Sequence, residues 1–263
     1  MDNQLFLSLI SGVFIGAAAA YLGTLMLSKK MSVVAGPLAH LALPGVALAI
    51  IFHFSLFFGV FPFIILGIIF IWFLEKKTKL PLENLAAITF AFGVGSALLI
   101  LSINEAEEAL IGNINNISLI EGLLVISIAL IIFYLTNKIY LRMMLINIHE
   151  ELAQTSGIDI NFYNFLYLLA IGLTVAIGVY LVGGLITVAL IATPSAVAKN
   201  LSNNLKTYQF WAIACGITMT IIGILLGRFY SLPTGPMIVV TGVLFFILTV
   251  FFKKNKDIPA NEK

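Results

Sequence analysis

The stretch "LFLSLISGVFIGAAAAYLGTLML" at residues 5–27 contains no charged residue and is followed by Ser28, Lys29 and Lys30. A membrane-spanning helix needs about 20 mostly apolar residues, so this stretch is long enough to cross a bilayer. It also exceeds the roughly 7–15 apolar residues of a signal peptide, and it ends in lysines where a signal peptide has a small-residue cleavage site. We therefore expect an uncleaved first membrane span.

Apolar stretches of this kind recur along the whole chain. The candidate spans are residues 5–27, 33–53, 56–74, 85–103, 118–137, 162–182, 185–198, 208–227 and 234–252. The seventh is short and contains Pro194, which favours a half-helix or a re-entrant segment. The sequence predicts an all-α, polytopic integral membrane protein of eight or nine transmembrane helices, some of them short or broken.

The composition excludes several classes of protein. Of the 263 residues, 61% are hydrophobic and only 10% are charged, whereas soluble domains carry about 25% charged residues. A water-soluble protein of this size could not cover so much apolar surface. The net charge of +2 gives no reason to expect a nucleic-acid partner. Cys215 is the only cysteine, so neither a disulfide framework nor a cysteine-based metal site is expected.

The basic residues predict the topology. Thirteen of the fourteen Lys and Arg residues fall into five clusters at residues 29–30, 76–79, 138–142, 199–206 and 253–263. If alternate loops are cytoplasmic, all thirteen lie on the cytoplasmic side and only Arg228 lies outside, as the positive-inside rule requires.

This topology favours an odd number of crossings, with the N-terminus outside and the C-terminus inside. We expect one transmembrane domain at residues 1–254, which includes a cytoplasmic loop at about 138–161. A cytoplasmic polar tail at residues 255–263 follows it.

Proline and glycine interrupt several of the expected spans, among them the second, the seventh and the start of the ninth. The second contains Pro44 and Gly45, and the seventh contains Pro194. Proline lacks the N–H that would bond the carbonyl four residues earlier, so each proline predicts a break. Irregular backbone at membrane depth is tolerated where it is packed in protein or lines a water-filled cavity. These breaks therefore indicate a translocation path, and proline kinks that only shape helix packing are the alternative.

The chain lacks the residues that would supply energy or catalysis. No Gly-Lys dipeptide occurs, so the phosphate-binding loop of an ATPase is absent. Among the expected spans only the fifth contains a charged residue, Glu121 at its outer end. Ion-coupled carriers usually keep charged groups in their spans. We therefore expect a transport protein that is not an enzyme and that takes its energy from elsewhere.

His40 is the one histidine expected well inside a span. An imidazole in hydrocarbon is costly unless it is satisfied, and imidazole is the commonest transition-metal ligand. His40 is therefore either a metal ligand or a histidine hydrogen-bonded to a neighbouring helix. His53 is expected at the outer interface and His149 in a cytoplasmic loop.

The cytoplasmic loop at 138–161 contains a predicted short helix at residues 149–154. Asn147 is suited to cap its start, with Glu150 three residues later in capping-box position. Gly157 is suited to the position that ends it. Such a helix would present Glu150 and Glu151 to a partner, and a solvated connector is the alternative.

Four segments, in order along the chain, resemble the membrane subunit of the bacterial zinc/manganese ABC importer family. They are "GPLAHLALPGVALAI" (36–50), "EELAQTSGI" (150–158), "YLVGGLITVALIATPSAVAKNL" (180–201) and "LPTGPMIVV" (232–240). The first is similar to the family's Ser-His-Ala-x-x-Pro-Gly region. The second is similar to its cytoplasmic Glu-x-x-Ala-x-x-x-Gly-Ile loop.

The resemblance implies a homodimeric permease in the lipid bilayer of a prokaryotic cell membrane. It also implies a separate ATPase subunit, an extracytoplasmic metal-binding protein and a transported divalent metal (zinc, manganese or iron), with no permanently bound cofactor. Residues 150–158 would dock in the ATPase, with Glu150, Glu151, Ala153 and Gly157 as coupling residues. His40 would be a transient metal ligand.

One position departs from the family's pattern. Metal-type members commonly carry an Asp four residues before the motif histidine, and this chain has Gly36 there. The expected ligand set is reduced to His40 with backbone carbonyls or its symmetry mate. A permease for a metal chelate of the siderophore or cobalamin type, and a stand-alone channel or carrier, are the alternatives.

Overall fold

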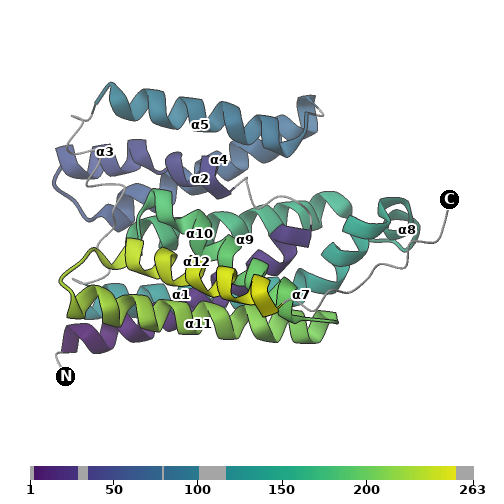
Figure 1. The fold of residues 1–263 in the computed structure, drawn as a ribbon. Coiled ribbons are helices and arrows are strands. Elements are labelled where there is room, and N and C mark those ends of the chain that lie inside the picture. Colours follow the sequence, from purple (N-terminus) through teal and green to yellow (C-terminus); the bar gives the residue numbers. More distant parts are fainter. Residues whose placement is uncertain (1–2, 29–34, 79, 101–116, 253–263) are drawn as a thin grey trace.

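In a computed structural model, residues 3–28, 35–78, 80–100 and 117–252 are described, and all their regular structure is helical (Figure 1). The predicted polar tail at 255–263 lies outside these residues. The helices are α1 (Asn3–Ser28), α2 (Ala35–His40), α3 (Leu43–Ile51), α4 (Leu56–Thr78), α5 (Leu82–Leu98), α7 (Leu119–Ile148), α8 (Glu150–Thr155), α9 (Ile160–Leu181), α10 (Gly184–Leu201), α11 (Leu205–Phe229) and α12 (Thr234–Phe252).

These helices match the nine expected spans, so the predicted fold class is confirmed. Among the described residues, α1, α4, α7, α9, α11 and α12 are long and apolar enough to cross a membrane. The apolar segments 35–51 and 84–98 are shorter. The segment 35–51 comprises α2 and α3, so the second span is broken as the sequence predicts.

The helices form two groups that pack together. Helix α1 lies against α7, α9, α10 and α11, and α12 packs on α10 and α11. Helices α2 to α5 form the second group, which rests on α9 and α10 through α2 and α4. Helix α5 has α2, α3 and α4 as its main neighbours and lies along one edge of the molecule (Figure 1).

Glycines bring the helix backbones into direct contact. A Cβ on Gly16 of α1 would lie 2.7 Å from the carbonyl oxygen of Gly216 of α11. A Cβ on Gly45 of α3 would likewise lie 2.7 Å from the carbonyl carbon of Gly59 of α4. Small residues of this kind let helices approach closely where lipid provides no hydrophobic force between them. The Gly45–Gly59 contact holds the second half of the broken span against α4.

The seventh expected span differs from its prediction. Helix α10 is continuous through the buried Pro194, so it is neither a half-helix nor a re-entrant segment. The hydroxyl of Thr193 donates to the carbonyl of Ala189, and that of Ser195 donates to the carbonyl of Ala192 at 2.8 Å. Such side-chain bonds help a membrane helix to accommodate proline.

The fifth expected span is longer than predicted, because α7 extends to Ile148. Its additional turns bury Ile139, Met143 and Ile146 along one face. This packing makes a rigid helix of residues 138–148, which the sequence assigns to a loop.

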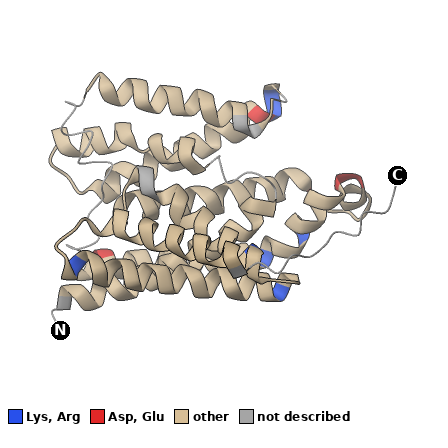
Figure 2. Ribbon diagram, in the orientation of Figure 1, with Lys and Arg blue, Asp and Glu red and all other residues tan. Residues whose placement is uncertain are grey.

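Charged side chains separate toward the two ends of the bundle. Figure 2 shows Lys and Arg gathered at the end that carries α8, with one basic segment at the opposite end. Lys76 and Lys77 lie in the last turn of α4, and Lys199 lies in the last turn of α10. Arg228 lies in the last turn of α11, and Lys206 lies in its first turn. The predicted segregation of charge is therefore present among the described residues.

Candidate functional site

The break between α2 and α3 lies immediately after His40. The N–H of Leu41 donates to the carbonyl of Pro37 at 3.3 Å, and that of Ala42 donates to the carbonyl of Ala39 at 3.3 Å. Because Pro44 has no N–H, the carbonyl of His40 cannot receive the usual helical bond from it. The backbone therefore turns at residues 41–42 and resumes as α3.

Helix α5 covers this break through a glycine. A Cβ on Gly93 would lie 2.8 Å from the carbonyl oxygen of His40 and 2.9 Å from the Cα of Leu41. Any larger residue would push α5 away from the irregular backbone. Gly93 thus lets protein pack against the break.

The imidazole of His40 lies at a pocket between three helices. Its ring meets the ring of Phe90 edge-on, with centroids 5.0 Å apart and planes at 81°. The side chain is half-buried, and its Nδ1 atom is buried without a hydrogen-bond partner among the described residues. The pocket has a volume of about 500 Å³ and is lined by Gly36, Pro37, His40, Ala87, Phe90, Val188 and Ala192.

Among the described residues that line this pocket, His40 is the one with an ionisable side chain. The described residues contain no group of three or more His, Cys, Asp or Glu side chains that could hold a metal ion. Pro44 and Gly45 follow His40 along the same broken span, and Pro194 lies two residues after Ala192 in α10. The pocket therefore contains one imidazole and lies beside the α2–α3 break, whereas Pro194 lies within the continuous α10.

The other two histidines lie at the protein surface. His53 is exposed, with a φ of 53°, in the turn between α3 and α4. His149 is exposed at the residue that joins α7 to α8. Neither histidine lines the His40 pocket.

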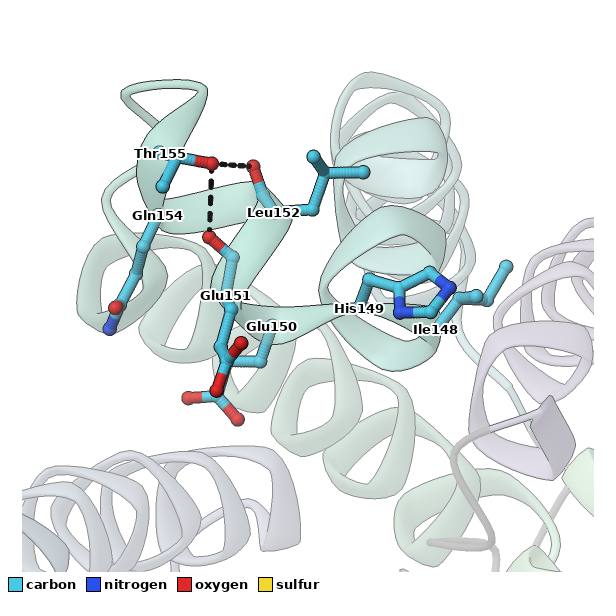
Figure 3. A pocket seen from close by; sticks show the side chains of 7 residues that line it. All are labelled: Ile148, His149, Glu150, Glu151, Leu152, Gln154 and Thr155. Atoms are coloured by element: carbon cyan, nitrogen blue, oxygen red, sulfur yellow. Dashed lines mark hydrogen bonds between the residues drawn. The ribbon is translucent and has the colours of Figure 1, made fainter.

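The second candidate site is α8, which projects at one end of the bundle (Figure 1). Ala153 is fully buried, whereas Glu150 and Glu151 are exposed. Figure 3 shows the two carboxylates extending in the same direction, away from His149. A hollow of about 760 Å³ is lined by Ile148, His149, Glu150, Glu151, Leu152, Gln154 and Thr155. The predicted short helix is thus present and presents its acidic side chains.

The end of α8 is fixed by a Schellman motif at Gly157. The N–H of Ile158 donates to the carbonyl of Ala153 at 3.1 Å, and that of Gly157 donates to the carbonyl of Gln154 at 3.0 Å. Gly157 has a φ of 77°, which glycine adopts without steric cost. Ala153 belongs to the hydrophobic core and Ile158 packs against it. Helix α8 is therefore anchored to the membrane domain.

The predicted cap at Asn147 is wrong. Asn147 lies within α7, and His149 is the N-cap of α8 without a side-chain cap bond. The reason is that α7 continues to Ile148 and buries one face of its last turns, so Asn147 remains within the helix. Both polar atoms of its amide are buried, without a hydrogen-bond partner among the described residues.

Three side-chain caps, at the starts of α7, α9 and α11, are absent from the sequence prediction, and α7 and α9 are the helices that flank α8. Ser118 and Glu121 form a capping box at the start of α7, and Asp159 caps α9 by accepting from the N–H of Phe162 at 3.1 Å. The Ser-x-x-Glu spacing of the first is a known start signal for a helix. These caps fix where α7 and α9 begin.

Comparisons with known proteins match nearly the entire chain. A family model described as the ABC 3 transport family matches residues 1–253. The manganese import system permease protein ScaB of Streptococcus gordonii is 25% identical over 248 residues, which cover 93% of this chain and 89% of that protein. The high-affinity zinc uptake system membrane protein ZnuB of Haemophilus influenzae is 29% identical over 263 residues, which cover 97% and 100%.

The fold also matches a solved structure. PsaBC from Streptococcus pneumoniae, in complex with Fab, superposes with a TM-score of 0.81 at 24% identity. The match covers 95% of this chain and 91% of that chain. At this identity the similarity supports the helical architecture.

Replacing Gly157 with alanine is expected to loosen the end of α8. A non-glycine residue in the left-handed conformation costs about 1–2 kcal/mol, and a Cβ here has open space, so the effect is purely conformational. Backbone amides of residues 156–158 should exchange hydrogen roughly five- to thirtyfold faster in the Gly157→Ala protein, measured by mass spectrometry. Gly157→Asn is the matched control, because asparagine tolerates this conformation. Equal exchange in wild-type and alanine proteins would contradict the motif.

Proposed function

The chain belongs to the ABC 3 transport family, and we propose from this premise that it is the permease subunit of an importer for a divalent transition metal. Zinc, manganese and iron are the candidate ions. The observation that carries the proposal is the unpartnered Nδ1 of His40 at a pocket beside the broken α2–α3 span. A neutral imidazole nitrogen is a suitable ligand for these ions.

A homodimer accounts for the small number of ligands. One chain supplies one imidazole, whereas two chains related by a twofold axis along the pore would supply two. Two imidazoles with water or backbone oxygens make a weaker site than a closed tetrahedral zinc cage. Weak binding suits a pathway that must release its ion after each cycle.

Energy would reach this pathway through α8. The chain lacks a Gly-Lys phosphate-binding loop, so ATP hydrolysis is assigned to a separate ATPase subunit. Helix α8 is joined to α7 by His149 alone and to α9 by residues 156–159. Closure of two ATPases on the two α8 helices would therefore move α7 and α9, which pack on each other and on α1. Such a rigid-body movement can alternate access to a central site.

The charge distribution supports an orientation in the cell membrane. The basic end that carries α8 would face the cytoplasm, where ATP is present. Helix α1 would then start outside, and α12 would end inside. An extracytoplasmic metal-binding protein would dock on the opposite end, where Arg228 ends α11.

Replacing His40 with alanine tests the proposed pathway. ATP-dependent uptake of zinc, manganese and iron is measured in cells that express the chain with its ATPase and binding protein. We expect the initial rate for the transported ion to fall at least tenfold, because the pocket loses its nitrogen ligand. His53→Ala is the matched control, since it removes an exposed histidine. An unchanged rate in His40→Ala would remove His40 from the pathway, and competition by a chelate but not by free metal would favour a chelate permease.

Reversing the charge of Glu150 tests the docking of α8. The Glu150→Arg protein is expected to retain less ATPase subunit when the complex is purified, because an exposed carboxylate of the contact becomes a guanidinium. Lys206→Glu is the control, since it reverses an exposed charge at the same end of the bundle, on α11 and not on α8. Full retention of the ATPase by Glu150→Arg would argue against this contact.

A further inference from the structure

A groove lies between α4 and α5 and is separate from the His40 pocket. We define the α4–α5 groove by the residues that line it, which are Leu41, Phe63, Leu66, Gly67, Ile69, Phe70, Trp72, Phe73, Ile88, Thr89 and Phe92. Its volume is about 780 Å³, within the range of small-molecule binding pockets. Phe92 is 65% exposed and Phe70 is 52% exposed. The described part of the chain therefore leaves this apolar groove open.

The length of the groove matches one leaflet of a bilayer. Its α4 wall runs from Phe63 to Phe73, which is about 15 Å at 1.5 Å per residue. The hydrocarbon core of a bilayer is about 30 Å thick. The groove thus suits an acyl chain that extends from the membrane surface to the midplane.

The surface end of the groove is positively charged. The Nζ atom of Lys76 lies 3.8 Å from the ring centroid of Trp72, and that of Lys77 lies 5.0 Å from the ring centroid of Phe73. Both rings line the groove. Lys76 and Lys77 are exposed, whereas Glu75 is half-buried. Among the described side chains at this end of the groove, the exposed charges are those of Lys76 and Lys77, and both are positive.

We propose that the α4–α5 groove binds a phospholipid with an anionic headgroup, whose acyl chain fills the groove and whose phosphate meets Lys76 and Lys77. Basic sites between membrane helices are suited to such headgroups. A second copy of this chain fits the groove less well. A twofold axis along the membrane normal would bring the same lysines of both copies together at one membrane surface.

Tryptophan fluorescence tests the proposal, because Trp72 lines the groove and Trp211 is the only other tryptophan. A Trp211→Phe protein is reconstituted in phosphatidylcholine vesicles that contain bromine-labelled phosphatidylglycerol or bromine-labelled phosphatidylcholine at equal fractions. We expect about tenfold or greater preference of Trp72 for the labelled phosphatidylglycerol, since each lysine near an anionic lipid contributes roughly a factor of five.

Two further variants test whether the preference depends on the two lysines and on the position of Trp72. Lys76→Gln with Lys77→Gln should abolish the preference at Trp72, and comparing the two lipids within one variant cancels any change in intrinsic fluorescence. A Trp72→Phe protein reports from Trp211, which is exposed on α11 five residues after Lys206. Trp211 should show a smaller preference.

Three results would overturn the proposal. Equal quenching of Trp72 by both lipids would exclude headgroup recognition. A preference that survives the two glutamine substitutions would exclude the lysines. Quenching by neither lipid would show that protein, such as a second copy, covers the groove.

Discussion

The hydrocarbon of a membrane offers no hydrogen-bond partner to the protein backbone, and this constraint underlies the structure. It favours long helices such as α1, α9 and α11. It allows an irregular backbone only where other parts of the protein cover it. The α2–α3 break meets this condition because Gly93 brings α5 against the carbonyl of His40. The unpartnered Nδ1 of His40 and the pocket beside it therefore lie where the helical pattern stops.

The two candidate sites lie in different parts of the molecule. The His40 pocket lies between α2, α5 and α10, whereas α8 lies at one end of the bundle, where basic residues gather (Figure 2). Helices α7 and α9 join them, since both flank α8 and α9 packs on α2, α4 and α10. Under the proposed function, a movement of α8 would reach the pocket through α9, which packs on α2 and α10.

The sequence predicts those features that depend on neighbouring residues. Span positions follow from apolar length, the α2–α3 break follows from the missing N–H of Pro44, and the end of α8 follows from Gly157. Features that depend on contacts between residues far apart in the chain are not predicted from the sequence. The extension of α7 to Ile148 relies on burial against other helices. The continuity of α10 through Pro194 is an exception, because the hydroxyls of Thr193 and Ser195 that bond its backbone are local. The Phe90 and Gly93 contacts at His40 join residues about fifty positions apart.

The most direct test is metal accumulation by proteoliposomes that contain this chain, with and without its ATPase subunit and binding protein. A permease energised by a separate ATPase should accumulate zinc, manganese or iron only when ATP and both partner proteins are present. Metal flux through the chain alone, down a gradient and without ATPase, would contradict this account and identify a channel or carrier.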